Sequence, residues 1–154
     1  MPTNATIYFS HKRFLSRNQL SAFDKNCKVE TPKHPVKGTV STILVSWPGI
    51  ELKLNPMGSS KVPEHVQGFQ GYLRQILGGA DPNETTAVFV DRVDGVQQVL
   101  GCVYDPAGDG TAFAFIVRLA EALDGLLFLE DGSLVIARSR LALRSNGSCE
   151  METF

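Results

Sequence analysis

The chain of 154 residues is 43% hydrophobic and 20% charged, with a formal net charge of −1 at pH 7. This composition excludes a disordered chain, and the length suffices for one globular domain with its own core over residues 1–154. No apolar run is long enough to cross a membrane, and the first residues lack the order of a secretory signal.

The cysteines Cys27, Cys102 and Cys149 are far apart in the sequence and include no CxxC pair. This spacing excludes a disulfide framework and the usual zinc site, so we expect a reducing, cytoplasmic location. We predict a bacterial type of protein with no membrane association, no metal and no cofactor.

Charge is distributed unevenly along the chain. Residues 1–61 contain nine Lys or Arg and three Asp or Glu, whereas residues 62–154 contain six and thirteen. A basic first part can attract an anionic partner, but neither half is extreme, and oppositely charged halves of one domain attract each other. We therefore do not expect a nucleic-acid partner, and nucleic-acid binding through the lysine-rich first third of the chain remains a third alternative.

The N-terminal residues predict little regular structure. Residues 3–10 form a short strand, residues 16–26 a short helix or irregular segment, and Pro32 and Pro35 mark a loop. We expect residues 1–38 to be an irregular basic segment that packs on a sheet.

Residues 39–47 and 50–55 predict two strands, joined into a hairpin by the turn pair Pro48-Gly49. From Val62 the hydrophobic period changes to that of a surface helix, which Pro63 begins and Gly78 ends. The apolar stripe of this helix consists of Val62, Val66, Phe69, Leu73 and Ile76.

Residues 85–93 and 96–104 predict a second hairpin around Asp94-Gly95, and a nearly all-apolar helix follows over residues 111–124. Residues 126–137 predict a last hairpin around Asp131-Gly132, whose first strand is covered on both faces. An edge strand then carries Arg138, Arg140 and Arg144, which discourage pairing with other strands, and residues 145–154 are expected to fray.

From Ile50 onward the predicted order is strand, helix, strand, strand, helix, strand. This is the split βαβ (βαββαβ) order of a ferredoxin-like α+β fold, with both helices on one face of an antiparallel sheet. Residues 39–144 form this core, extended by an N-terminal hairpin partner strand and a C-terminal strand. The other face needs a cover, which the first fifty residues or a second copy of the chain would supply.

The sequence DPAGDG at residues 105–110 is the nearest approach to a chemical motif. A calcium loop of the EF-hand type fails, because Ala107 and Ile116 stand where ligands are needed. A phosphate-binding P-loop fails as well, because the loop has no lysine and carries two acids. The remaining interpretation is a helix cap formed by Asp109 or Thr111.

Catalytic motifs are missing from the chain. There is no GxSxG, and the histidines His11, His34 and His65 form no metal-binding spacing. Cys102 falls within a predicted core strand, where cysteine behaves as a small hydrophobe. We therefore expect a protein that is not an enzyme.

One group of polar residues can be assembled from the predicted fold. If residues 50–55 and 96–104 are neighbouring parallel strands, the loops that follow them lie side by side at helix N-termini. Ordinary helix caps with a Lys61–Asp salt bridge are the alternative. The residues of this predicted ligand site are Ser59, Ser60, Lys61, His65, Tyr104, Asp105, Asp109 and Thr111.

The sequence thus favours a regulatory, adaptor or immunity-like module that binds a protein partner or forms a homo-oligomer. The alternative is a small-ligand-binding domain or enzyme that uses the paired loops 55–65 and 104–111, with Asp105 or Asp109 as acid or base and Lys61 binding an anionic group.

Overall fold

The computed structural model describes residues 2–10, 15–30, 42–78, 83–106 and 108–154. These residues form four helices and nine strands. In chain order they are β1 (Thr3–Phe9), α1 (Arg17–Ser21), β2 (Lys28–Glu30), β3 (Ile43–Trp47), β4 (Ile50–Pro56), α2 (Val62–Ile76), α3 (Ala87–Asp94), β5 (Gln98–Tyr104), α4 (Thr111–Ala122), β6 (Leu126–Phe128), β7 (Leu134–Ile136), β8 (Leu141–Leu143) and β9 (Cys149–Met151).

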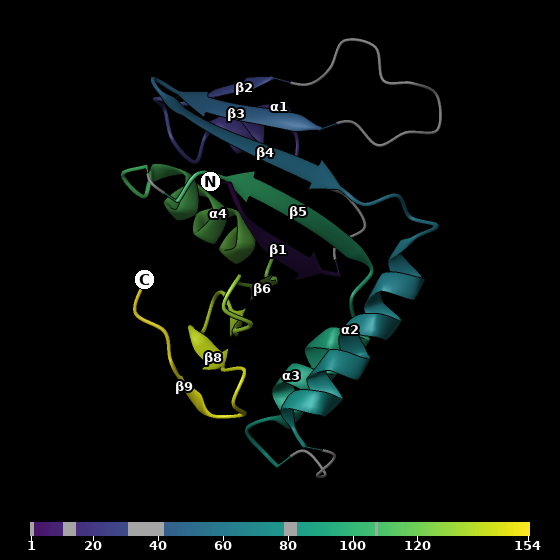
Figure 1. The fold of residues 1–154 in the computed structure, drawn as a ribbon. Coiled ribbons are helices and arrows are strands. Elements are labelled where there is room, and N and C mark those ends of the chain that lie inside the picture. Colours follow the sequence, from purple (N-terminus) through teal and green to yellow (C-terminus); the bar gives the residue numbers. More distant parts are fainter. Residues whose placement is uncertain (1, 11–14, 31–41, 79–82, 107) are drawn as a thin grey trace.

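The strands form one sheet in the order β2-β3-β4-β5-β1-β6-β7-β8-β9, and every pairing in it is antiparallel. The N-terminal strand β1 lies in the middle, between β5 and β6 (Figure 1). The helix α4 connects β5 to β6, which run in the same direction with β1 between them.

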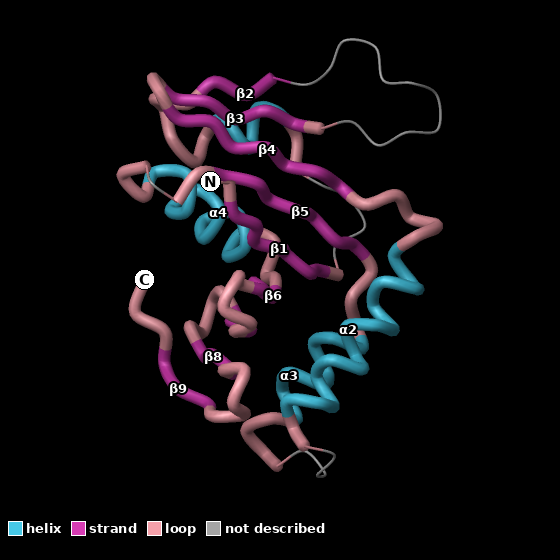
Figure 2. The backbone as a smooth tube through the Cα atoms, viewed as in Figure 1, coloured by secondary structure: helices cyan, strands magenta, loops and turns pink. Residues whose placement is uncertain are grey.

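Helices cover the two faces of the sheet differently (Figure 2). On one face, α4 packs on β4, β5 and β6, and α1 lies on β2, in a core that contains Ile7, Leu54 and Phe115. On the opposite face, α2 and α3 lie side by side and pack on the end of β1 and on β6, β7 and β8. Tyr8 and Leu126 belong to this second core. Within the described part of the chain, no helix covers this face of β4 and β5, and the exposed residues Glu51 and Lys53 of β4 lie there.

Much of the predicted element order is confirmed. The helices over 62–76 and 111–124 are α2 and α4, and the hairpins around Pro48-Gly49 and Asp131-Gly132 join β3 to β4 and β6 to β7. Gly49 has a φ of 75°, the left-handed conformation that favours glycine in such a turn. The loop with Pro32 and Pro35 lies outside the described residues.

The strand predicted over residues 85–93 is wrong, because this segment contains the helix α3. Its valines favour a strand by composition. However, both neighbours of β5 in the sheet are occupied, by β4 and β1. A reciprocal pair of hydrogen bonds starts the helical segment: the backbone N–H of Thr86 donates to Asn83 Oδ1 (2.8 Å), and that of Asn83 donates to Thr86 Oγ1 (2.9 Å). Phe89 and Val93, four residues apart, then bury one face of the helix.

This helix also changes the predicted fold class. The chain is an α+β protein, but the sheet is larger than predicted and a ferredoxin-like fold is not confirmed. The helices do not share one face, since α2 and α4 pack on opposite sides. The second face of β6 needs neither the N-terminal segment nor a second copy as its cover, because α2 and α3 supply it.

Both ends of the chain differ from the prediction. Residues Thr3–Phe9 are the middle strand of the sheet, not part of a segment that packs on it. The strand β8 is not an edge strand, because β9 pairs beyond it, so the expected fraying of residues 145–154 is wrong for Cys149–Met151. Arg144 stabilises the position of β9 through two ion pairs, from Nε to Glu150 Oε1 and from Nη1 to Glu152 Oε2, each 2.7 Å long.

Among the residues that the structure describes, no helix is long and apolar enough to span a membrane.

Candidate functional site

The two loops of the predicted ligand site lie at opposite ends of their strands. β4 and β5 are neighbours, but their antiparallel register pairs Leu52 with Tyr104 and Pro56 with Leu100. The backbone N–H of Met57, just after β4, donates to the carbonyl of Val99 at the start of β5 (2.9 Å). The prediction that these loops lie side by side is therefore wrong, and with it the Lys61–Asp salt bridge.

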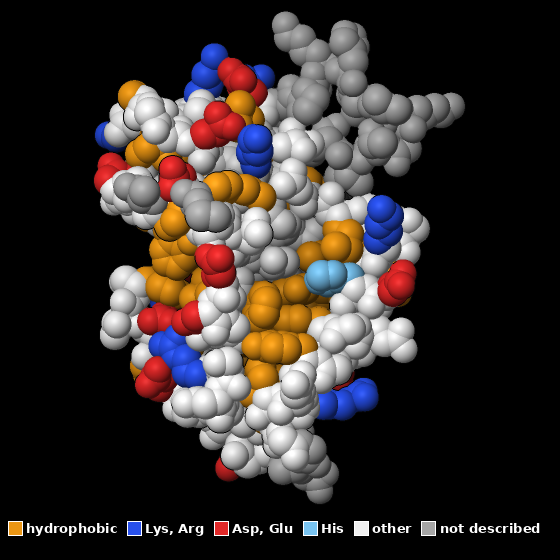
Figure 3. Space-filling model, in the orientation of Figure 1, with side chains coloured by type: hydrophobic (Ala, Val, Ile, Leu, Met, Phe, Trp, Pro, Cys, Tyr) orange, Lys and Arg blue, Asp and Glu red, His pale blue; other side chains and the backbone are white. Residues whose placement is uncertain are grey.

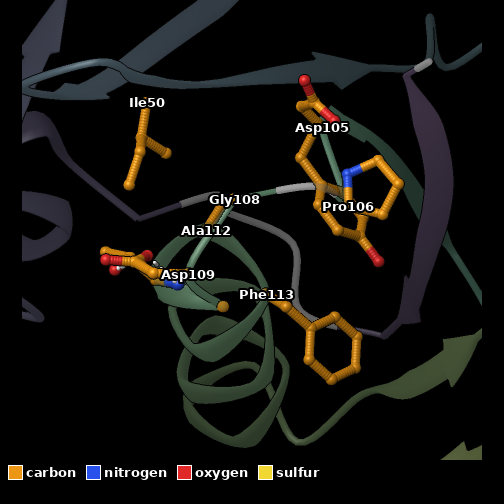
Figure 4. Close-up of a pocket in the computed structure, with 10 residues that line it drawn as sticks. Ile50, Asp105, Pro106, Gly108, Asp109, Ala112 and Phe113 are labelled. Atoms are coloured by element: carbon orange, nitrogen blue, oxygen red, sulfur yellow. Dashed lines mark hydrogen bonds between the residues drawn. The ribbon is translucent and has the colours of Figure 1, made fainter.

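Four of the predicted residues line a small cavity that we name the α4 pocket. It has a volume of about 240 Å³ and lies where β5 leads into α4. Its lining residues are Ile50, Tyr104, Asp105, Pro106, Gly108, Asp109, Gly110, Thr111, Ala112 and Phe113. Figure 4 shows that the side chains of Asp105 and Asp109 point away from each other. Two carboxylates in this arrangement do not share a proton or a ligand.

Asp109 acts as a local cap in the α4 pocket, as predicted. Its Oδ1 accepts hydrogen bonds from the hydroxyl and from the backbone N–H of Thr111, the latter at 3.0 Å. These bonds stabilise the carboxylate and lower the pKa of Asp109. The negative charge also stands at the positive end of the α4 dipole. The polar groups of this loop are thus used to begin a helix.

Three other predicted residues line a larger cavity, which we name the α2 groove. It has a volume of about 600 Å³, within the range of small-molecule sites. Ser60, Lys61 and His65 are predicted residues that belong to it, whereas Ser59 is exposed and does not line it. The full lining consists of Thr6, Asn55, Pro56, Met57, Gly58, Ser60, Lys61, His65, Val99 and Gly101.

The floor of the α2 groove is a row of residues across three strands. Gly101 on β5 pairs with Thr6 on β1 and with Asn55 on β4, so the three stand directly opposite one another. Asn55 Oδ1 accepts a hydrogen bond from the hydroxyl of Thr42 (2.7 Å), which fixes the amide and leaves its NH₂ group as a donor. The row therefore presents a hydroxyl, a gap without a side chain, and an amide.

No local structural demand accounts for a glycine at position 101. Its φ lies outside the left-handed region, and the register on both sides of β5 continues without a bulge. A Cβ at Gly101 would come no closer than 3.6 Å to any atom, which is ordinary contact. A glycine inside a strand weakens it and often marks a place where a ligand approaches the backbone.

The wall of the α2 groove is the first turn of α2. His65 Nε2 is 2.9 Å from the hydroxyl of Tyr8, and burial raises the pKa of that hydroxyl. Tyr8 therefore remains protonated, and its hydrogen bond with Nε2 holds the imidazole ring in place. Figure 3 shows the histidine on this face, next to a gathering of hydrophobic side chains.

The two cavities differ in charge. The α2 groove is lined by Lys61 and by no acid, whereas the α4 pocket is lined by two acids and by no base. No side chain caps the first turn of α2, which contains Pro63, a residue without a backbone N–H, and Glu64, which does not line the groove. Among the described lining residues, Lys61 is thus the group that favours an anion.

The floor residues of the α2 groove were not predicted from the sequence. Thr6, Asn55 and Gly101 come from three strands and meet only through the register of the sheet. The one available signal was the isolated glycine within the strand pattern of residues 96–104, which is a recognised marker of close approach.

Among the described residues, no group of three or more His, Cys, Asp or Glu side chains could hold a metal ion. No protein-family model matches the chain, and neither a curated protein nor a solved structure is similar to it.

Proposed function

We propose that this protein is a binding domain for a small anionic molecule, which it holds in the α2 groove. The observation that supports this proposal most is Gly101, an unfilled position in the floor of a groove whose described lining residues include Lys61 and no acid. Thr6, Asn55, Ser60 and Lys61 offer hydrogen-bond donors around that position, and donors of this kind orient carboxylate and phosphate groups.

Binding suits this set of groups better than catalysis does. The described residues that line the α2 groove include no carboxylate and no thiol, and the imidazole of His65 already has a hydrogen-bond partner in Tyr8. The acids that the sequence offered as acid or base, Asp105 and Asp109, belong to the α4 pocket at the other end of β5. The hydrogen-bond partner of His65 is thus Tyr8 and not one of the hydroxyls of Ser60 and Thr6 that line the groove.

An NMR titration with sodium acetate and with inorganic phosphate tests this proposal. We expect the amide signals of Thr6, Gly101 and Lys61 to shift and saturate, while those of Asp109 and Thr111 stay in place. Lys61→Met should weaken binding about fivefold, the equivalent of roughly 1 kcal/mol for an exposed charge. Lys53→Met is the matched control, because Lys53 is an exposed lysine of β4 that does not line the groove. Shifts spread over the whole surface, or equal effects of both variants, would contradict the proposal.

A second candidate function is the binding of a protein partner or of a second copy of the chain. A cavity of about 420 Å³ on the outer side of α4 favours it, lined in part by Phe113, Ala114, Val117 and Phe154. Phe154 is 46% exposed, and aromatic side chains are enriched where proteins associate.

Light scattering over a range of protein concentrations tests self-association at this surface. We expect the mass to approach that of a dimer and Ala114→Arg, which places a charge in the cavity, to restore the monomer. A monomer at the highest concentration in the unchanged protein would rule out the dimer.

A further inference from the structure

We infer that the ligand of the α2 groove is a planar aromatic molecule with one anionic group, its ring lying on Gly101 and its anionic group facing Lys61. This inference rests on the proposed function and adds the chemical class of the ligand. Three features of the groove support it: a flat floor, an aromatic stack that ends in the wall, and the separation of apolar from cationic contacts.

The floor offers a flat surface of the kind that a ring covers. Adjacent strands lie about 4.8 Å apart, so Thr6 and Asn55 flank Gly101 at a separation of about 10 Å from each other. Between these two side chains only backbone is present. A planar ring can approach that backbone to van der Waals distance, whereas a bulky aliphatic group cannot fill the gap as evenly.

An aromatic stack ends at the groove. The rings of Phe69 and Tyr8 are stacked, with centroids 4.3 Å apart and planes 19° apart. Tyr8 is stacked in turn on His65, at 5.6 Å and 20°. Phe69 and Tyr8 are buried, whereas His65, at the end of the series, is exposed and lines the groove. Aromatic pairs contribute beyond the area that they bury.

Apolar and cationic contacts come from different parts of the lining. Pro56, Met57 and Val99 offer hydrophobic contact at the ends of β4 and β5, and the flexible side chain of Met57 adapts to the shape of a ring. Ser60 and Lys61 precede the first turn of α2 and supply a hydroxyl and a cationic group, while Glu64 of that turn does not line the groove. A ligand that satisfies both parts is amphipathic.

Isothermal titration calorimetry with five probes tests the inference: 2-naphthoate, 2-naphthyl phosphate, the neutral 2-naphthamide, acetate and inorganic phosphate. We expect the two naphthyl anions to bind at least about tenfold more tightly than 2-naphthamide, because a charged hydrogen-bonded group is worth about one decade or more. We expect the same margin over acetate and inorganic phosphate. The tighter of the two naphthyl anions identifies the anionic group as carboxylate or phosphate.

Two variants separate the contributions of ring and charge. Gly101→Val fills the floor and should weaken the naphthyl anions at least about tenfold while changing inorganic phosphate less than about threefold. Lys61→Met should weaken every anion and leave 2-naphthamide unchanged. Val103→Leu and Lys53→Met are the controls, since both positions belong to β5 and β4 outside the groove. Circular dichroism checks that each variant is folded.

The outcomes distinguish the inference from the proposed function. If acetate or inorganic phosphate binds as tightly as the naphthyl anions, the ring is not recognised and the inference is overturned, while anion binding stands. If 2-naphthamide equals 2-naphthoate, the anionic group is irrelevant and the inference fails. If none of the five probes binds, both the inference and the proposed function fail.

Discussion

The α2 groove and the α4 pocket look alike in the sequence and differ in the structure. Each follows a strand, contains glycine and polar residues, and leads into the first turn of a helix. In the α4 pocket the polar groups pair locally, as Asp109 does with Thr111. In the α2 groove they surround an unfilled floor. The polarity of a loop thus does not identify a binding site. The residues of neighbouring strands that the loop faces do identify it.

The two cavities also differ in what supports them. Behind the wall of the α2 groove, Tyr8 and Phe69 are 3% and 7% exposed. In the α4 pocket, Tyr104 and Phe113 are half-buried, and Phe113 meets the exposed ring of Phe154 edge-on at 5.4 Å. We expect the groove to be the more rigid of the two, and the predictions below compare them.

The largest expected difference concerns one aromatic ring in each region. Phe69→Ala should lower the free energy of unfolding by about 3–5 kcal/mol, because it leaves a cavity between Tyr8 and Phe128. Phe113→Ala should cost only about 1–2 kcal/mol, since a half-buried ring loses little more than its ring contacts. Urea denaturation measures both values. Equal costs would show that the two regions are equally well packed.

A smaller difference is expected for the two tyrosine hydroxyls. Tyr8→Phe removes the hydrogen bond to His65 and should cost about 1 kcal/mol of unfolding free energy. Tyr104→Phe is the matched change in the α4 pocket and should cost less than about 0.5 kcal/mol, because the structure gives its hydroxyl no hydrogen bond. Denaturation compares the stabilities, and the ring signals of His65 should move only in Tyr8→Phe. Movement of these signals in both variants would contradict the assignment.

Gly101→Val should stabilise the protein by about 0.5–1 kcal/mol, since valine suits a strand better than glycine does and the position has room for a Cβ. A gain in stability together with a loss of ligand binding would be the signature of a glycine kept for its ligand. Thermal unfolding without ligand measures the stability. A loss of several kcal/mol would instead show that the glycine is required by the fold.

The smallest effect is expected at Asp109. Thr111→Val removes the hydroxyl that contributes most to the lowered pKa of Asp109, so this pKa should rise toward its ordinary value. A lowered carboxyl pKa stabilises the folded state above the ordinary pKa and ceases to do so as pH falls through the folded-state value. The stability difference between the two proteins should therefore exist at neutral pH and vanish in acid. A carbon-detected NMR titration measures the pKa, and Thr111→Ser, which keeps a hydroxyl, should leave it low.

The sequence predicted local structure well and spatial arrangement poorly. The period of Val62, Val66 and Phe69 located α2, and the turn pair Pro48-Gly49 located a hairpin, because both depend on neighbouring residues. The valines of residues 85–93 pointed to a strand, and only the occupied neighbours of β5 show why a helix forms there. That single error reversed the relative direction of β4 and β5.

The candidate site was predicted in part, because some of its residues follow from local sequence patterns and others only from the arrangement of the strands. Lys61 and His65 were expected near a ligand because they begin a helix after a strand. Their expected partners, Asp105 and Asp109, line the α4 pocket at the other end of β5. Their actual neighbours in the groove, Thr6 and Gly101, are brought together by the register of β1 and β5, which no short stretch of sequence specifies.

The central position of β1 has a consequence for how the chain folds. Phe9 pairs with Gln98, and Ile7 pairs with Leu127, so the partners of β1 follow it by about 90 to 120 residues in the sequence. Contacts between such distant residues require the closure of long loops, which slows folding. Until β5 and β6 emerge, the hydrophobic residues of β1 remain unpaired. The floor of the α2 groove, which needs β1 and β5 together, cannot form before these two distant strands have paired.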